Sequence, residues 1–151
     1  MTPGMKRESV NIWFCLIDKI NNYMASSCDI ILRRMTDPNC IFCKIVAREI
    51  SSQKEFEDET VLAFRDIHPI APTHILIIPK KHISSLADTE KEDIEILGKI
   101  QFVAKNLAHQ HGINNAFRLL LANGAPAGQA VFHLHYHLIG GWKNPPVMET
   151  R

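Results

Sequence analysis

The chain has 151 residues, a length that suits one domain with a hydrophobic core. Hydrophobic residues make up 46% and charged residues 22% of it, as in ordinary globular proteins, and the formal net charge of +1 gives no electrostatic reason to expect a nucleic-acid or membrane partner. No stretch approaches the roughly 18 uninterrupted apolar residues that a membrane-spanning helix needs.

Residues 1–34 are the least informative part of the sequence. Apolar residues between positions 10 and 20 could form an amphipathic helix that packs on the domain or on a partner. The same stretch imitates a signal peptide, but Asp18 and Lys19 interrupt its short apolar run. Alternatively, Met35 is the natural start. We therefore treat residues 1–34 as an extension of unknown role.

The elements that follow are predicted to be one short helix and then three strands. Residues 40–47 are expected to form a short helix. Segments 54–57 and 60–64 are typical of two strands joined by a turn. The almost wholly apolar run 74–79 predicts a strand buried on both faces, and Pro79 ends it.

A long helix follows, capped by Asp88 or Thr89 and ending before Gly112. Segment 116–121 is expected to be another strand, and the loop 122–129 contains glycines and a proline that favour tight turns. With the histidine-containing segment as the last strand, this order predicts an α+β fold with an antiparallel sheet of about five strands, one long helix and one short helix. The buried stripe of the long helix is expected to contain Leu97, Ile100, Ala104, Leu107 and His111.

Three histidines near the C-terminus alternate with apolar residues. In a strand, His133, His135 and His137 would share one face and the residues between them would face the core. Each imidazole has two polar nitrogens that need partners. The row could bind a metal, perform nucleophilic or acid–base chemistry, or make three unrelated hydrogen bonds. The strict alternation, between Gly128-Gln129 and Gly140-Gly141, favours a functional site.

The run 133–139 matches the His-φ-His-φ-His-φ-φ signature of the histidine triad (HIT) superfamily, in which φ is an apolar residue. The chain from about Cys40 to Pro146 is similar to the Hint branch of that superfamily, the nucleoside phosphoramidases. The resemblance implies that residues 35–151 form a HIT domain, and that the protein is a homodimer whose sheets join across the two-fold axis. Further segments that match this branch are 64–67, 71–74, 78–82 and 140–141.

The same resemblance implies catalytic roles. His135 would be the nucleophile that attacks the α-phosphorus of a purine nucleotide, and His137 would contact the phosphate. His74 would extend a relay toward His133. Asp66 would hold the ribose hydroxyls, since a carboxylate can accept two O–H donors. The other residues that the resemblance places at the nucleotide are Phe42, Ile45, Phe64 and Ile67 around the base, and Gly128, Gln129 and Ala130 near the phosphate or leaving group.

Two positions depart from the Hint pattern. Many Hint-branch enzymes have a serine after the Gly-Gln pair, where this chain has Ala130. An asparagine is also expected where Ala122 stands, and Asn123 is one position away, which reverses the direction of a side chain in a strand. Asn123 is therefore only a candidate for nucleotide contact. Both departures concern the leaving group and the rate more than nucleotide binding.

A second group of residues has the composition of a closed zinc site. Cys40 and Cys43 have metal or redox spacing, and His82 and His133 could complete the ligand set. Some bacterial HIT proteins carry zinc on matching positions, so the resemblance implies structural zinc; two reduced thiols under a helix are the alternative. Nothing indicates secretion, which favours a reducing, cytoplasmic setting. The other cysteines, Cys15 and Cys28, are expected to be ordinary thiols.

The function that the resemblance implies is hydrolysis of the P–N bond of purine nucleoside phosphoramidates, which releases AMP or GMP and an amine. A dinucleoside polyphosphate hydrolase of the Fhit type is an alternative. That branch usually has Pro-Arg after the triad, whereas Gly140-Gly141-Trp142 and then Pro145-Pro146 follow it here. A nucleotide-binding regulatory module with little turnover is a third possibility, consistent with Ala130 in place of serine.

Overall fold

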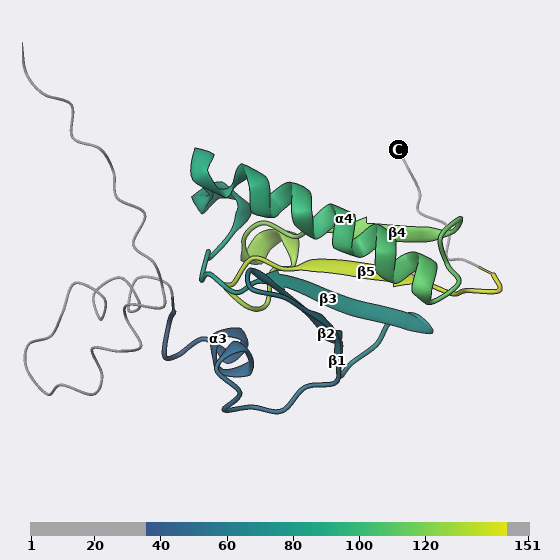
Figure 1. The fold of residues 1–151 in the computed structure, drawn as a ribbon, viewed down its shortest axis with the longest axis horizontal. Coiled ribbons are helices and arrows are strands. Elements are labelled where there is room, and N and C mark those ends of the chain that lie inside the picture. The colour runs from purple at the N-terminus through teal and green to yellow at the C-terminus, as the bar shows by residue number, and fades with distance from the viewer. Residues whose placement is uncertain (1–35, 145–151) are drawn as a thin grey trace, which may run out of the picture. The chain divides into compact units, whose positions relative to one another are not determined.

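The computed structural model describes residues 36–144 (Figure 1). The helix expected between positions 10 and 20, and Pro145-Pro146, lie outside the described residues. Helices α3 (Ile41–Val46) and α4 (Ile94–Gln110) are accompanied by the 3₁₀ turns η2 (Leu86–Asp88), η3 (Lys91–Asp93) and η4 (Ala125–Ala127). The strands are β1 (Lys54–Glu57), β2 (Val61–Arg65), β3 (Thr73–Pro79), β4 (Phe117–Leu120) and β5 (Tyr136–Gly140).

All five strands form one antiparallel sheet in the order β1-β2-β3-β5-β4. The long helix α4 lies along one face of the sheet, and the short helix α3 lies on the opposite side (Figure 1). The sheet, the long helix and the short helix confirm the predicted α+β class.

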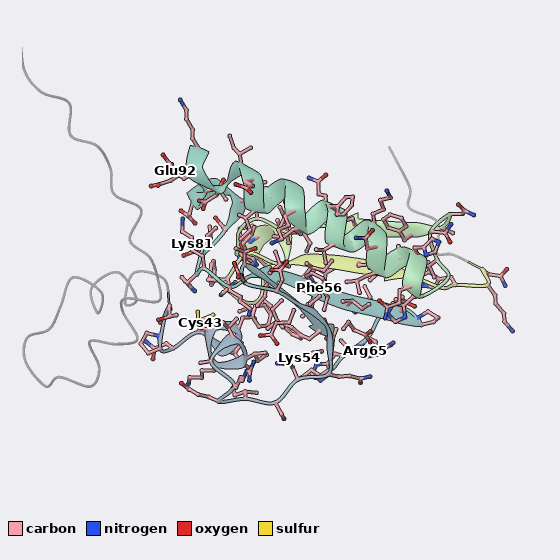
Figure 2. The ribbon with its side chains drawn as sticks, viewed as in Figure 1. Cys43, Lys54, Phe56, Arg65, Lys81 and Glu92 are labelled. Atoms are coloured by element: carbon pink, nitrogen blue, oxygen red, sulfur yellow. The ribbon has the colours of Figure 1, made fainter. Side chains whose placement is uncertain are left out.

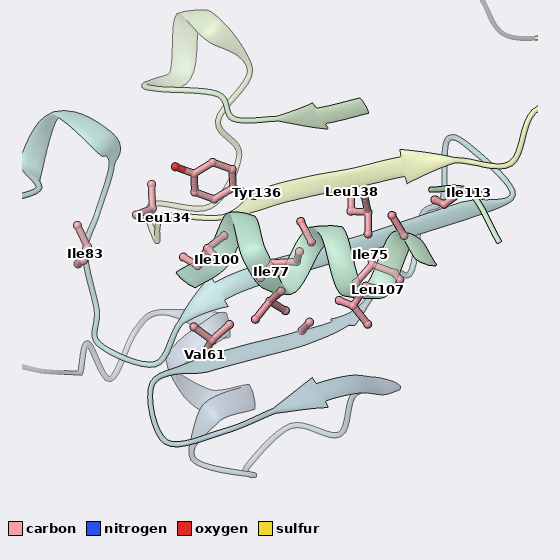
Figure 3. Close-up of a cluster of buried hydrophobic side chains, with 14 residues drawn as sticks. Val61, Ile75, Ile77, Ile83, Ile100, Leu107, Ile113, Leu134, Tyr136 and Leu138 are labelled. Carbon is pink, nitrogen blue, oxygen red and sulfur yellow. The ribbon is translucent and has the colours of Figure 1, made fainter. Parts of the chain in front are cut away.

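The central strand β3 is buried along its whole length, as its apolar sequence predicts. Because side chains alternate along a strand, Ile75 and Ile77 face α4 and pack against Ile100 and Leu107 (Figure 3). The intervening Leu76 and Ile78 belong to a second core, formed with α3. The sheet therefore separates two apolar layers, and the functional side chains lie on the α3 side.

The helix α4 begins later than the sequence indicates. A cap was expected at Asp88 or Thr89, but the two turns η2 and η3 come first and the regular helix begins at Ile94. The backbone N–H of Glu90 donates to Oδ2 of Asp93 at 3.0 Å, which satisfies a donor at the start of η3. Within residues 36–144, no helix is both long and apolar enough to cross a membrane. The buried face of α4 consists of Ile100, Val103, Ala104, Leu107 and Ala108.

The segment with three histidines is only partly a strand. β5 begins at Tyr136, so His137 lies in the strand while His133 and His135 precede it. The backbone N–H of Leu134 donates to the carbonyl oxygen of Ile83 at 2.6 Å, in a distant loop. The expectation of one continuous strand is therefore wrong, because the backbone before residue 136 bonds outside the sheet.

The alternation of side chains nevertheless extends through this segment. Leu134, Tyr136 and Leu138 belong to the core under α4 (Figure 3). The rings of His133 and His135 both contact Phe42 of α3, on the opposite side. The predicted division of this segment into an apolar side and a histidine side is therefore correct.

Candidate active site and metal centre

A cleft of about 800 Å³ lies beside the histidines, a volume within the usual range of small-molecule sites. Its walls come from α3, from the end of β2 with the loop to β3, and from the connection between β4 and β5. His133, Asn123, Gly128 and Gln129 are not among the residues that line it. The predicted site residues that do line it are Phe42, Ile45, Phe64, Asp66, Ile67, His74, Ala130, His135 and His137.

His135 has one ring nitrogen engaged and one available. The residue is buried, with 5% of its surface exposed, and it lines the cleft. Its Nδ1–H donates to the carbonyl oxygen of His133 at 2.6 Å. A neutral imidazole carries one N–H, so Nε2 keeps a lone pair. The ring of Phe42 packs edge-on against it, with 5.4 Å between centroids. An oriented imidazole with a bare nitrogen is what nucleophilic catalysis requires.

His74 and His137 form a hydrogen-bonded pair beside it. The backbone N–H of Ile70 donates to Nδ1 of His74 at 3.3 Å, so the proton of that ring is on Nε2 and is donated to Nδ1 of His137 at 2.8 Å. His137 in turn carries its proton on Nε2. Burial lowers the pKa of both rings, that of His137 to about 4 with a further contribution from its histidine neighbours. Both rings are therefore neutral near pH 7.

The partner of His74 differs from the expected one. A relay toward His133 was predicted, but His74 bonds to His137 instead. In the register of β3 and β5, Leu76 lies opposite His137 and His74 lies opposite Ile139. The two histidines are therefore diagonal neighbours on one face of the sheet. His133 precedes β5, and its ring points to the cysteines of α3.

Gln129 holds the loop before the histidines rather than facing the cleft. Its Oε1 accepts the backbone N–H of Gly124 at 2.8 Å, and its Nε2 donates to the carbonyl oxygens of Ser84 at 2.6 Å and Val131 at 3.1 Å. The side chain is buried and its hydrogen bonds are internal. In this arrangement the side chain of Gln129 is engaged within the loop and does not face the side of the cleft where a contact with the phosphate or leaving group was expected.

Asn123 also faces away from the cleft, because its Oδ1 accepts the backbone N–H of Ala87 at 2.9 Å. Gly128 adopts a φ of 92°, in the left-handed region that favours glycine, and it ends the turn η4. These two residues and Gln129 shape the connection between β4 and β5. None of the three supplies a side chain to the cleft.

Sequence reasoning missed several residues of the cleft, most of which belong to no motif. Leu120 is an example, since it was assigned to a strand and not to a site. It lies opposite His137 in the register of β4 and β5, so the period of two along β4 could have identified it. The other lining residues that were missed are Ile41, Ile50, Ser51, Ser52, Arg65, His68, Ile70, Leu76, Leu121, Ala122, Ala127, Val131 and Ile139.

The predicted cysteine–histidine group does come together. Its four possible ligand atoms all lie within 4.8 Å of one another. Cys43 Sγ is 3.2 Å from Nδ1 of His82 and 3.6 Å from Nδ1 of His133, and Cys40 Sγ is 3.4 Å from the same His133 nitrogen. Cys43 belongs to α3 and is labelled in Figure 2. Both cysteines are free thiols.

The donor set fits a zinc ion. His133 Nε2–H donates to the carbonyl oxygen of Pro79 at 2.8 Å, so its Nδ1 presents a lone pair to the thiols. A tetrahedral zinc ion with bonds of about 2.3 Å to sulfur and about 2.1 Å to nitrogen places these atoms about 3.6 Å apart. Burial raises the pKa of Cys43 to about 11 and lowers that of His133 to about 4. A bound cation would offset the cost of forming the buried thiolate.

Comparisons with known proteins agree with this geometry. The family model described as "Scavenger mRNA decapping enzyme C-term binding" matches residues 39–151. The chain is 48% identical over 120 residues to the 14 kDa zinc-binding protein of Zea mays, a match that covers 78% of this chain and 94% of the relative. It is 45% identical over 108 residues to Adenylylsulfatase HINT1 of Arabidopsis thaliana, which covers 70% and 74% of the two chains.

Solved structures of similar sequence share the fold. A HIT family hydrolase from Legionella pneumophila Philadelphia 1 is 48% identical with a TM-score of 0.68, over 70% of this chain and 95% of that one. A histidine triad protein from Clostridium difficile is 43% identical with a TM-score of 0.71, over 76% of this chain and 100% of that one. With its histidine row, its five-stranded sheet and these relatives, the chain belongs to the histidine triad superfamily.

Proposed function

We propose that the protein hydrolyses the P–N bond of purine nucleoside phosphoramidates, releasing AMP or GMP and an amine. The observation that carries this proposal is the orientation of His135. The His133 carbonyl holds its Nδ1–H, and the bare Nε2 belongs to a side chain that lines the cleft. A neutral imidazole held in this way is ready to attack a phosphorus centre without first losing a proton.

The reaction has two displacements. In the first, Nε2 of His135 forms a bond to the α-phosphorus and the P–N bond to the amine breaks. The electron pair stays on the amine nitrogen, which takes up a proton from solvent. In the second, water attacks the phosphorus and the bond to Nε2 breaks. The electron pair returns to the imidazole, a proton is released to solvent and the nucleoside monophosphate leaves.

The remaining residues of the cleft would orient the nucleotide. The Nε2–H of His137 would donate to a phosphate oxygen, since its Nδ1 is already occupied by His74. Asp66 Oδ1 accepts the backbone N–H of His68 at 2.8 Å, which orients the carboxylate to accept the ribose hydroxyls. Phe42 and Phe64, packed edge to face at 5.6 Å, would contact the base.

Zinc, held by Cys40, Cys43, His82 and His133, would have a structural role. When bound it would tie α3 to the loop after β3 and to the histidine segment, and no chemical step passes through it. The Zea mays relative is named a zinc-binding protein, which supports the assignment. The two reduced cysteines, which contact histidines, also support a reducing, cytoplasmic location for the protein.

We also propose that the protein is a homodimer. β4 is an edge strand, and Phe117 and Leu120 on it are 36% and 39% exposed. An edge strand with exposed apolar side chains can pair with the same strand of a second copy across a two-fold axis. Such pairing would extend the sheet across the two-fold axis.

Incubation with an adenosine phosphoramidate tests the proposed activity. Release of AMP and the amine supports it, whereas binding without release would favour the regulatory module. Faster hydrolysis of diadenosine polyphosphates would favour the Fhit-type alternative. Adenylyl sulfate is a further substrate to compare, because the Arabidopsis thaliana relative is named an adenylylsulfatase.

A further inference from the structure

A buried hydroxyl beside the cleft lacks a hydrogen-bond partner. Among the residues that the structure describes, the Oγ of Ser52 is the one buried side-chain nitrogen or oxygen without a partner in the protein. The buried polar side chains of His74, His133 and Gln129, by contrast, all make hydrogen bonds. A hydroxyl that leaves water without gaining a partner costs free energy. In the lining of a cleft, such a hydroxyl is a candidate for ligand contact.

Ser52 lies at the nucleoside end of the cleft. Just before β1, the backbone N–H of Arg65 donates to the carbonyl oxygen of Gln53 at 2.9 Å, so the antiparallel pairing of β1 with β2 extends beyond the first strand. The residues that come next to this hydrogen bond are Ser52 on one side and Asp66 on the other, and both line the cleft. The pairing therefore brings Ser52 near the carboxylate that is proposed to hold the ribose hydroxyls.

The neighbouring lining of the cleft is apolar. Between positions 41 and 50, the residues that line it are Ile41, Phe42, Ile45 and Ile50. Phe64 of β2 adds a second aromatic ring, packed against that of α3. These side chains can cover the faces of a purine, but they offer nothing to the nitrogens and the exocyclic group at its edge. A base bound there loses water from those atoms and needs a hydrogen-bond partner, as the hydroxyl of Ser52 does.

Rotation about one bond can turn the hydroxyl toward a ligand. The Oγ of Ser52 is buried, whereas the residue as a whole is partly exposed. A serine side chain has several staggered positions about its Cα–Cβ bond. Because no hydrogen bond holds the Oγ where it lies, its rotation breaks no contact of that kind. A bound base would supply the missing hydrogen bond and so stabilise the rotated position.

We propose that the hydroxyl of Ser52 hydrogen-bonds to the six-membered ring of the purine base and thereby determines base preference. This inference rests on the proposed function, which puts a nucleotide in the cleft. A hydroxyl both donates and accepts, so it serves adenine and guanine alike. A base of the same shape without polar atoms in that ring should bind less well, because the hydroxyl then stays without a partner.

Two substrates that differ only in the base test this inference. Benzimidazole riboside has the fused-ring shape of adenosine, but its six-membered ring carries neither a nitrogen nor an amine. We expect kcat/KM to be higher for the adenosine phosphoramidate than for the benzimidazole riboside phosphoramidate. Ser52→Ala should reduce this ratio by about fivefold, roughly 1 kcal/mol. The loss should appear in KM rather than in kcat, since the base is held equally in the ground state and in the transition state.

Ser51→Ala is the matched control, because it removes a hydroxyl from the preceding residue. Ser51 also lines the cleft, but it is an exposed residue. The substitution should leave the ratio of the two kcat/KM values as in wild type. An unchanged ratio in Ser52→Ala, or an equal fall of the ratio in both variants, would overturn the proposal.

The stability of the free protein is a second readout. Ser52→Ala removes a hydroxyl that has no partner, so the free energy of unfolding without ligand should equal or exceed that of wild type. A hydroxyl with a structural role would behave in the opposite way, since its removal leaves its partner unsatisfied. A clear fall in the free energy of unfolding of Ser52→Ala therefore contradicts the inference.

A failure of this inference can be told apart from a failure of the proposed function. If wild-type protein hydrolyses neither phosphoramidate, the proposed function is wrong. The contact with the base is then tested by the Kd values of AMP and of benzimidazole riboside monophosphate. Ser52→Ala should weaken the binding of AMP by about fivefold and leave the other Kd unchanged. Equal effects on the two Kd values would refute the contact.

Discussion

At the scale of single residues, backbone carbonyls decide which nitrogen of each histidine is available. The carbonyl of His133 accepts Nδ1–H of His135, and the carbonyl of Pro79 accepts Nε2–H of His133. The bare nitrogen is therefore Nε2 in His135, which lines the cleft, and Nδ1 in His133, which faces Cys40 and Cys43. Two histidines separated by one residue thus serve different sites because their hydrogen-bond acceptors differ.

The half-buried ring of His137 should make stability depend on pH. Its pKa is about 4 in the folded protein against an ordinary value of 6.5, so the unfolded chain binds more protons between these values. Its contribution to the free energy of unfolding is complete above about pH 6.5 and is lost as the pH falls toward about 4. In urea unfolding, His137→Asn should lose less of its free energy of unfolding than wild type as the pH falls across this range. The amide oxygen of the asparagine can still accept the His74 N–H.

The control for this prediction is His109→Asn, which changes an exposed histidine on α4. It should follow the wild-type dependence of unfolding free energy on pH. A His137→Asn variant that loses stability as steeply as wild type would contradict the role given to burial.

The sequence predicts which side chains share one face better than it predicts which hydrogen bonds their atoms make. The alternating spacing of the triad predicts which side chains face away from the α4 core, because that depends only on the period of a strand. The partner of His74 depends on the register of β3 against β5, and the direction of Gln129 depends on Ser84 and Gly124. Those contacts are made by residues distant in sequence or by a loop conformation, and no local pattern encodes them.

At the scale of elements, α3 connects the cysteine–histidine group to the ring of His135. Cys40 and Cys43 face His133, and Phe42 between them packs against the rings of both His133 and His135. A change in how α3 is held should therefore move Phe42 and loosen His135. The helix has only six residues, so its position depends on these contacts more than on its intrinsic stability.

Removal of the metal should therefore lower the stability of the fold. We expect wild-type protein to contain one zinc ion per chain, and a chelator or Cys43→Ser to lower Tm by roughly 10 °C. Elemental analysis and thermal unfolding measure the two effects. Cys28→Ser should change neither. Retention of zinc in Cys43→Ser, or an unchanged Tm after chelation, would show that the group does not hold a structural metal.

The connection between β4 and β5 should depend on Gln129. Gln129→Ala leaves the N–H of Gly124 and the carbonyl of Ser84 without their partner, so we expect the free energy of unfolding to fall by about 2 kcal/mol. Gln101→Ala, on the exposed side of α4, should change it by less than about 0.5 kcal/mol. Equal effects of the two substitutions in urea unfolding would refute this assignment.

Elements differ in how well their sequence predicts them. β3 is buried on both faces, so its apolar run identifies it without further context. The start of β5 is not predictable in this way, because the backbone N–H of Leu134 bonds to Ile83 instead of to a neighbouring strand. The start of α4 moves for a similar reason, since turns η2 and η3 intervene and a bond between Glu90 and Asp93 closes the second of them.

At the scale of the whole molecule, the sheet has one edge that should pair with a second copy. We expect light scattering coupled to gel filtration to give twice the mass of one chain. Phe117→Asp introduces a charge on the edge strand β4 and should shift the protein toward the monomer. Leu86→Asp changes a similarly exposed apolar residue on η2 and should leave the mass unchanged. A wild-type protein with the mass of one chain would disprove the dimer.

The proposed catalysis depends on several parts of the molecule at once. His135 directly precedes β5, contacts Phe42 of α3 and lines the cleft. Substitution of His135 by alanine should abolish turnover while leaving the fold, and thus the unfolding transition, close to that of wild type. Turnover should be lost because no other histidine that lines the cleft, among the described residues, has a ring that is oriented by an acceptor and keeps a bare nitrogen.

The most direct test is mass spectrometry of protein quenched during a single turnover of an adenosine phosphoramidate. The account predicts a nucleotidyl group bound to His135 in wild type and none in His135→Ala, which should release no AMP. An adduct on another residue, or AMP release by His135→Ala at the wild-type rate, would contradict it.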